Sequence, residues 1–514
     1  MAGKLFPIVT QPGIKRDGTQ FAGNYYIDGL WNRFQRGLPR KMGGYRRLLT
    51  ALPNIVRKTF VFPAIPNFNV FLGDFETLKY FPIDQNGIVA GPLVDRTPVG
   101  FQVDADNLWQ FDIMYDRVNA ATKLIAHAAP NLSYITNTVE RPIYFGDLNS
   151  VAPLTATGVS VSGGILVLGP FLISFGNDGL VNISFANDPT TIQNTARPTA
   201  QKIVFGLPTR AGNSSPGGLL WSLNSLIRMT LVQSTPEPIF AFDTVAGESS
   251  ILSSSSVIEY DGVFFWAGID RWFAYQGVVQ ELKNDMNRNF FFQNLNYSQR
   301  QKVWAAKLPE FGEIWWFFPM GSSLECNHAV VFNVREKTWY DTPAPRASGY
   351  YEQVFAEPIW MDNGDVNFAG PYSSWVHETG RDLNVGGVIT PVGYDQNIDG
   401  ILTPIDAYFQ TGDIAWAAVG PTGNWTGIDR WIDLFRVEPD FIQSGDLTLT
   451  VNGQEYARGP LQPSVPYVFD ATTTFIDTPE QRRFMTLKVE SNTLGGFYEL
   501  GQTLLLFRVG DDRP

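Results

Sequence analysis

Short apolar runs separated by glycine turns recur along most of the chain, and they predict β-strands. In four places an apolar strand ends in a glycine, and an aromatic or aliphatic strand follows after a turn. The four glycines are Gly73, Gly176, Gly268 and Gly370, which lie 103, 92 and 102 residues apart. Each interval is about twice the ~40–50-residue length of a propeller blade, so we expect one more unit in each interval.

Hairpin-like pairs of apolar runs lie midway between these copies, near residues 110–128, 219–242 and 313–340. Together with the four copies they make seven units between about residues 55 and 390. The sequence therefore predicts an all-β protein with a β-propeller of six or seven blades. A β-solenoid is less suitable, because its repeats are usually ~20–30 residues long and regular. Helical periodicity is scarce, and residues 285–304 are its best example.

The two ends of the chain differ from the repeated part. Apolar strands at residues 447–451, 484–489 and 503–507, the first leading into an Asn452-Gly453 turn, predict a separate sheet structure. The first ~50 residues have too little apolar sequence for a core of their own. We therefore predict three parts: an N-terminal arm (1–54) that docks on another domain or subunit, the β-propeller (55–390), and a C-terminal β-sandwich-like platform domain (391–514).

Composition excludes several classes of function. Lys and Arg number 38 against 50 Asp and Glu, so the formal net charge of the 514-residue chain is −12. A surface of this sign repels nucleic acid and anionic lipid. One cysteine and three histidines are too few for a disulfide framework or a zinc cluster. No membrane span is expected, because the uncharged stretch 148–177 is broken by polar residues and glycine turns.

The N-terminal arm is basic despite the acidic whole, and aromatic residues are interleaved with its arginines. We interpret Arg33, Arg36 and Arg40 as contacts to a neighbouring subunit or an adaptor protein. A nucleic-acid patch is the alternative, but the other predicted strands lack further basic clusters.

One loop has the spacing of a calcium site. Asp395, Asn397, Asp399, the Ile401 carbonyl and Asp406 fit the pattern D-x-[DN]-x-[DN]-G-x5-[DE] around one hard cation. Prolines on both sides argue against flanking helices, and a turn rich in Asp, Asn and Gly is common in linkers. A solvated turn is therefore the alternative that we favour.

The sequence contains none of the motifs G-x-S-x-G, G-x-x-x-x-G-K-[ST], H-E-x-x-H or C-x-x-C. We therefore expect no enzymatic activity, no catalytic residues and no cofactor apart from the calcium considered above. The acid pairs Asp104/Asp106 and Glu378/Asp382 could serve a glycosidase, but a chain with 50 acids offers many such pairs.

A Gly-Ile-Asp-Arg turn between two tryptophans occurs twice, at residues 266–272 and 425–431. Tryptophans at the ends of such a turn could stack on sugar rings or on a partner chain. Core tryptophans flanking a tight turn are the alternative, and we favour it.

Several segments resemble the tail nozzle (tail hub, or "stabilisation") proteins of short-tailed bacteriophages. The resemblance is carried by Pro12-Gly13-Ile14, Arg16-Asp17, Tyr26-Ile27-Asp28-Gly29, Asn32-Arg33-Phe34, Gly37 to Tyr45, Gly262 to Trp266, Glu313 to Pro319, and Gly510 to Pro514. These motifs cover both ends and the middle of the chain, and they are patterns of turns and strands rather than of catalytic groups.

The resemblance implies a structural virion protein that forms the distal tail nozzle. Such a nozzle is a homohexameric conduit for DNA ejection below the head-to-tail adaptor protein, assembled in the bacterial host cytoplasm and located in the virion tail. Viral DNA would pass through without specific binding, which suits a net charge of −12. Attachment of tail fibres or spikes, and of a needle or plug, stays open. The alternative from another class is a propeller-based tail protein that binds or degrades host glycans.

Overall fold

Strands account for nearly all the regular structure of the computed structural model. The model describes residues 4–19, 24–49, 52–64, 67–85, 87–117, 119–130, 139–154, 160–209, 216–233, 237–352, 357–364, 373–376, 383–385, 388–390, 393–415, 418–419, 425–427, 430–457 and 459–512. Within these ranges the helical segments are α1 (Arg288–Asn294) and the 3-10 turns η1 (Asn177–Gly179), η2 (Ser254–Ser256) and η3 (Tyr297–Lys302). Both α1 and η3 lie in the one stretch whose pattern suggested a helix.

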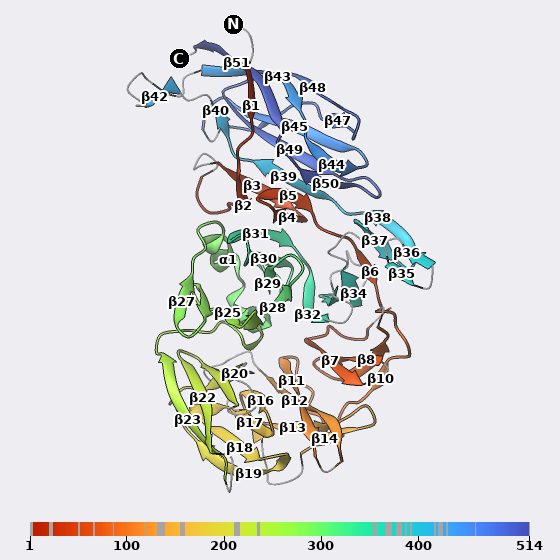
Figure 1. Cartoon of the computed structure of the whole chain (residues 1–514), viewed down its shortest axis with the longest axis vertical. Helices are drawn as coiled ribbons and strands as arrows, with labels where there is room; N and C mark the ends of the chain where they lie inside the picture. The colour runs from red at the N-terminus through yellow and green to blue at the C-terminus, as the bar shows by residue number, and fades with distance from the viewer. Residues whose placement is uncertain are drawn as a thin grey trace.

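Seven antiparallel sheets form a closed ring in the described part of the chain, and Figure 1 looks onto this ring. In blades 1 to 6 four strands follow one another in chain order. Blades 1 to 3 contain β7 (Lys58–Ala64), β8 (Asn67–Gly73), β9 (Leu78–Ile83) and β10 (Val94–Asp95); β11 (Asn107–Asp116), β12 (Ala121–Pro130), β13 (Arg141–Gly146) and β14 (Val151–Pro153), with β15 (Ser160–Val161) beside β13; and β16 (Gly164–Leu168), β17 (Phe171–Phe175), β18 (Val181–Phe185) and β19 (Asp188–Ala196).

Blades 4 to 6 repeat the arrangement. They contain β20 (Ile203–Pro208), β21 (Gly217–Ser222), β22 (Leu226–Gln233) and β23 (Ile239–Ala246); β24 (Ile258–Tyr260), β25 (Val263–Ala267), β26 (Trp272–Tyr275) and β27 (Val279–Leu282); and β28 (Trp304–Leu308), β29 (Glu313–Phe318), β30 (His328–Asn333) and β31 (Thr338–Pro343). The first strands of neighbouring blades contact one another around most of the ring, and η2 contacts both β20 and β28.

The seventh blade is completed by a strand from the other end of the chain. Its first three strands are β32 (Arg346–Glu352), β33 (Glu357–Asp362) and β34 (Ser373–Val376), and its fourth is β6 (Tyr45–Arg47). β6 pairs with β34 antiparallel, with Arg46 opposite Trp375. The ring is therefore closed by backbone hydrogen bonds between the N-terminal segment and the last blade.

The all-β propeller expected from the sequence is confirmed, and it has seven blades. Three of the four repeat glycines fall at or just after the second strand of blades 1, 3 and 5, and the midway hairpins are blades 2, 4 and 6. Gly370 lies outside the described residues. The role of Gly73 is steric, because a Cβ there would come within 2.5 Å of the Trp109 ring of the next blade.

The C-terminal part forms a sandwich-like domain of three sheets. The largest runs through β2 (Gln11–Ile14), β3 (Tyr25–Leu30), β39 (Ala407–Thr411), β49 (Phe484–Ser491), β45 (Leu447–Gln454) and β46 (Gln462–Pro463), with β40 (Ile414–Ala415) and β47 (Tyr467–Phe469) at its side. The second contains β1 (Lys4–Pro7), β51 (Leu504–Asp512), β43 (Arg430–Glu438) and β48 (Ile476–Arg482). The third contains β4 (Asn32–Gln35), β5 (Leu38–Lys41), β50 (Phe497–Leu500) and β44 (Phe441–Ser444).

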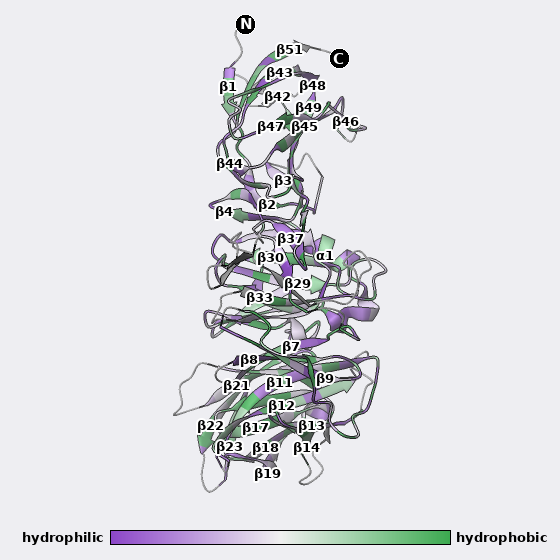
Figure 2. Ribbon diagram, turned by 90° about the vertical axis from the view of Figure 1, so that its right-hand side faces the viewer, coloured by the Kyte–Doolittle hydropathy of each residue, from purple (hydrophilic) through white to green (hydrophobic). Residues whose placement is uncertain are grey.

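The N-terminal segment therefore belongs to two sheet systems. Strands β1 to β5 pair within the C-terminal domain, whereas β6 belongs to the propeller. The sheet of the seventh blade continues beyond β6 into β37 (Asp395–Ile398), which pairs with β6 in parallel, and β38 (Ile401–Pro404). Two separate strand pairs are β35 (Leu383–Val385) with β36 (Val388–Thr390), and β41 (Ala418–Val419) with β42 (Trp425–Gly427). Figures 1 and 2 show the C-terminal domain beyond the rim of the ring, with both chain ends at its far side.

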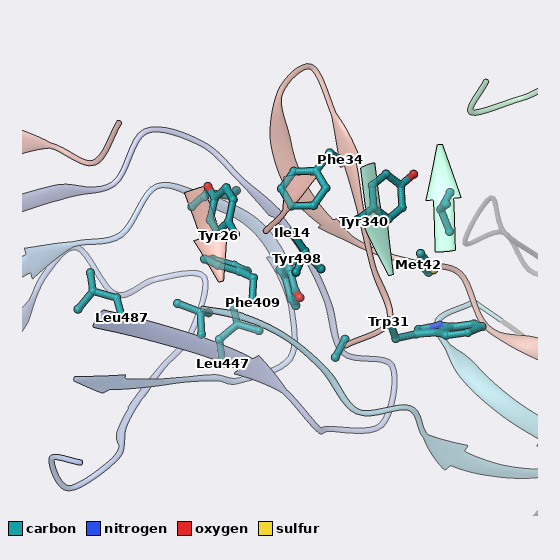
Figure 3. Packing of buried hydrophobic residues seen from close by; sticks show 14 of the residues in the cluster. Ile14, Tyr26, Trp31, Phe34, Met42, Tyr340, Phe409, Leu447, Leu487 and Tyr498 are labelled. Atoms are coloured by element: carbon teal, nitrogen blue, oxygen red, sulfur yellow. The ribbon is translucent and has the colours of Figure 1, made fainter. Parts of the chain in front are cut away.

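One hydrophobic core joins this domain to blade 6. β2, β3 and β4 contact β31, the outer strand of that blade. Phe34 on β4 packs against Tyr340 on β31 with ring centroids 5.5 Å apart, while Phe409 on β39 packs against Tyr498 on β50. All four side chains belong to the same buried cluster (Figure 3). Since apolar burial is the main stabilising term, this shared core holds the two parts in one orientation.

Blade 2 buries a histidine that cannot easily be charged. The His127 ring is fully buried, and its Nε2 lies 3.0 Å from the Val161 carbonyl oxygen. Burial lowers the pKa of His127 to about 4. The unfolded chain accepts a proton on this side chain near pH 6.5, whereas the folded protein does so only near pH 4.

We therefore expect His127 to reduce stability as the pH falls from about 6.5 to 4, by roughly 3 kcal/mol in total. His127→Gln keeps a donor for the Val161 carbonyl and does not titrate. Urea unfolding of both proteins at pH 7 and pH 4 measures the difference. Burial raises the pKa of Asp112 to about 6, so protonation of this carboxyl increases stability as the pH falls. Both proteins contain Asp112, so its contribution cancels when their losses of stability are compared. Equal losses in both proteins would contradict the prediction.

Candidate functional site

The predicted calcium loop is a tight β-hairpin. β37 and β38 are joined by Asp399 and Gly400, whose φ angles are +52° and +89°. Positive φ at both positions is the geometry of a type I′ turn, which favours Asp-Gly. The segment is therefore folded back on itself and does not wrap around one point.

The side chains of that hairpin have other partners. Asp395 accepts a hydrogen bond from the Gly495 amide at 2.8 Å, and Asn397 accepts one from the Gly400 amide at 2.9 Å. The Asp399 carboxylate forms an ion pair with Arg47. The hairpin pairs Asp395 with Pro404 and places Asp406 beyond the end of β38, so the five expected ligands do not converge. The described residues contain no group of three or more His, Cys, Asp or Glu that could hold a metal ion.

The three arginines expected at a subunit or adaptor contact lie in very different surroundings. The Arg33 side chain is only 1% exposed, and its Nε and Nη2 donate to the two carboxylate oxygens of Glu313 at 2.9 and 3.1 Å. It also stacks on the Phe311 ring, 3.6 Å from the centroid. Arg33 is therefore an internal link between β4 and blade 6, and its assignment to a subunit or adaptor contact is corrected.

Arg36 and Arg40 lie nearer the surface. Arg36 occupies the turn between β4 and β5, and its side chain is 77% exposed. Arg40 is half-buried and donates to Gln35. Both approach Glu499 on β50, at 3.5 and 3.9 Å. Of the three, only Arg36 has a largely exposed side chain.

Glu313 is the centre of a buried polar cluster. The residue is fully buried at the start of β29, and besides Arg33 it accepts hydrogen bonds from the Tyr340 hydroxyl at 2.5 Å and from Trp315 Nε1 at 2.9 Å. Burial and the neighbouring Glu313 carboxylate raise the pKa of Tyr340 well above its usual value. A buried carboxylate with four donors is fully compensated, so the cluster stabilises one relative placement of arm and blade.

A second polar chain crosses the same junction. Arg16 donates to Asp341 of blade 6 through Nε and Nη2 at 3.0 and 3.1 Å, and to Asp28 of β3 through Nη1 at 2.6 Å. Tyr408 on β39 donates to Asp28, and His328 lies 3.0 Å from Asp341. Burial opposes ionisation of Asp341, but the His328 hydrogen bond and the Arg16 charge hold its pKa below the usual value.

The arm also contacts the linker before blade 6. Asp17 accepts hydrogen bonds from the Asn289 and Phe290 amides at 2.7 and 2.9 Å. These amides lie in the first turn of α1, where a carboxylate satisfies free N–H groups and interacts favourably with the helix dipole. Glu336 similarly accepts from the Arg36 and Gly37 amides of the β4–β5 turn.

Sequence reasoning missed Arg16, Glu313 and Asp341 as partners in this junction. A usable signal was present, because Glu313 directly precedes five apolar residues and Asp341 follows Trp339-Tyr340. A carboxylate in such a strand must be compensated when it is buried, which points to an arginine elsewhere in the chain. Which arginine supplies the compensation depends on pairing between distant segments.

The tryptophans of the first Gly-Ile-Asp-Arg turn are core residues. Trp266 and Trp272 are both fully buried, and Trp272 packs among Phe291, Trp316 and Trp339. They offer no platform for a sugar ring. In the second copy Trp431 is half-buried, and residues 428 and 429 lie outside the described residues. The acid pair Glu378/Asp382 also lies outside them, while Asp104 faces Arg141 at 3.5 Å.

The propeller encloses a central cavity of about 710 Å³. First strands from all seven blades line it. Phe60 stands between Phe111 and Tyr350, with ring centroids 5.7 and 5.9 Å apart. The charged side chains in the lining are Lys58, Asp112, Glu259 and Lys307. This cavity was not expected from the sequence, because no local pattern shows which first-strand residues face the axis.

Comparisons with known proteins identify no family for the chain. No family model matches it, and no curated protein matches it. Similar solved structures include Raptor from Chaetomium thermophilum (10% identity, 65% of this chain, TM-score 0.38), BamB from Moraxella catarrhalis (12%, 70%, 0.35) and a chain of the Mitotic Checkpoint Complex (8%, 64%, 0.37). The matches span 29%, 98% and 94% of those chains. Matches with this sequence identity and TM-score give no information about the function of this chain.

A search of the described residues for a helix long and apolar enough to cross a bilayer finds none.

Proposed function

We propose that this chain is a non-enzymatic structural subunit of a bacteriophage tail nozzle, which assembles as a hexamer around the path of the ejected DNA. The observation that carries the proposal is where the nozzle-like motifs lie. Arg16, Asp17, Asp28, Arg33 and Glu313, which all belong to those motifs, form the junction between propeller and C-terminal domain.

A junction of this kind suits a subunit that transmits mechanical force between its domains. A buried ion-pair cluster at Arg33, a partly buried one at Arg16 and a shared apolar core fix the orientation of the two domains. Fixed orientation is what a ring needs if six identical subunits are to close on themselves. Enzymatic catalysis does not require polar contacts of this extent between domains.

The DNA path in this proposal lies between subunits. A cavity of about 710 Å³ is far too small for a duplex, whose grooves alone are ~12 and ~6 Å wide. A net charge of −12 on each subunit would let a polyanion pass without being held. The head-to-tail adaptor would then contact one end of the ring.

Sedimentation velocity of the full chain at tens of micromolar tests the assembly. We expect a species of six copies, and Arg36→Glu should weaken it without changing the unfolding temperature, because this arginine is exposed. Arg197→Glu is the matched control, since Arg197 is also exposed but lies in blade 3. The proposal would be rejected if the chain forms trimers, as expected of a glycan-binding tail protein. It would also be rejected if the chain stays monomeric when the adaptor is present.

A further inference from the structure

The side chain of Lys58, which lines the central cavity of the propeller, has no hydrogen-bond or ion-pair partner among the described residues. Lys58 is the first residue of β7 and lines the cavity, where the residue is half-buried. Burial lowers its pKa to about 8, with no compensating charge nearby. An ammonium group that is partly withdrawn from water is normally paired, because losing its hydration costs free energy.

The other charged groups of the cavity are already compensated. Asp112 on β11 accepts hydrogen bonds from the Val167 and Ile113 amides at 2.7 and 2.8 Å. Lys307 on β28 donates to the Glu259 carbonyl at 2.9 Å and lies 3.5 Å from the Glu259 carboxylate. The lining therefore leaves one cation, Lys58, free to receive an anion.

Aromatic rings surround the space next to this cation. Phe60 follows Lys58 by two residues on β7 and stands between Phe111 and Tyr350, and Phe205 and Tyr351 also line the cavity. Sites for small molecules commonly combine such an apolar wall with one or two polar groups in 300–1,000 Å³. A volume of about 710 Å³ lies in that range.

We propose that the central cavity binds a small organic anion with a flat apolar body, whose carboxylate or sulfonate pairs with Lys58 while its body packs against Phe60, Phe111 and Tyr350. The site does not depend on the oligomeric state or on the nozzle function. It uses no residue of the junction described above.

The proposal can be tested with naphthalene-2-carboxylate and its neutral analogue naphthalene-2-carboxamide, measured by calorimetry on the full chain. The two probes share one body, so their affinity ratio isolates the charge. We expect the carboxylate to bind at least tenfold more tightly at pH 7, because a charge-assisted contact contributes about one to two powers of ten. Phe111→Ala should weaken the binding of both probes.

Lys58→Met should reduce the affinity ratio to about one. Lys283→Met is the matched control, because this lysine is exposed and lies outside the cavity, so it should leave the ratio unchanged. The proposal would be overturned if neither probe binds at millimolar concentration, or if the wild type binds both with equal affinity. It would also be overturned if Lys58→Met keeps the affinity ratio of the wild type.

A measurement on the wild type alone covers the case in which Lys58→Met does not fold. Lys58 loses its proton between pH 7 and 9.5, so the affinity ratio should fall severalfold. The titratable groups lining the cavity with it are Asp112, Glu259, Lys307, Tyr350 and Tyr351, whereas β16 and β20 contribute only apolar residues and Gly206. Asp112 is already ionised at pH 7, since its pKa is about 6. A constant ratio over this range would overturn the proposal.

Discussion

Arg33→Met is expected to destabilise the protein by about 3–5 kcal/mol, because it leaves the buried Glu313 carboxylate without its cation. Methionine fills much of the volume of the arginine side chain, so the loss reports the missing charge rather than a cavity. The midpoint of urea unfolding, followed by tryptophan fluorescence, measures the effect. Trp315 donates to the same carboxylate and lies in the affected region.

Arg36→Met is the control for this experiment. It removes the same charge from the same hairpin, but at an exposed position where an ion pair contributes about 0–1 kcal/mol. We expect its unfolding midpoint to match that of the wild type. A loss below about 1 kcal/mol in Arg33→Met would show that Glu313 finds another partner, and the account of the junction would then be wrong.

Much of the propeller could be predicted because blade structure is local. Each blade is four consecutive strands joined by tight turns, and glycine marks the end of the second strand in blades 1, 3 and 5. Alternation of apolar and polar residues within a strand depends only on that strand and its neighbours. Spacing of about one blade per 50 residues therefore located blades 1 to 6, whereas the strand and glycine expected for the seventh unit lie outside the described residues.

Closure of the ring could not be predicted in the same way. β6 is three residues long and pairs with strands more than 300 positions later in the sequence. A short strand with two arginines carries no pattern that specifies such a partner. The same limit applies to Arg33, whose partner lies 280 positions away. The local sequence therefore predicts a subunit or adaptor contact for a side chain that is buried within the chain.

The calcium hypothesis failed for a different reason. The spacing of Asp395, Asn397 and Asp399 fits both a cation loop and a hairpin with an Asp-Gly turn. Pairing of β37 with β6 on one edge and β38 on the other decides between them, because it keeps the strand extended. A motif read along the chain contains no information about such lateral pairing.

Removal of residues 1–47 is expected to have the largest effect of all, because the segment contributes to every sheet of the C-terminal domain and completes the seventh blade. β6 forms backbone hydrogen bonds on both edges, with β34 and β37. Its loss would leave two open strand edges, which are sites for aggregation. The core between blade 6 and the C-terminal domain would also lose Ile14, Tyr26 and Phe34.

We expect the truncated chain to lose the cooperative thermal transition of the full chain and to be cut rapidly by protease within the seventh blade. Removal of residues 1–9 is the control, because it takes away only β1, which pairs on one side with β51 at the edge of its sheet. That shorter deletion should keep the cooperative transition with a modestly lower midpoint. If the chain lacking residues 1–47 unfolds as sharply as the chain lacking residues 1–9, β6 does not close the ring, and blades 1 to 6 must hold the seventh blade by packing alone.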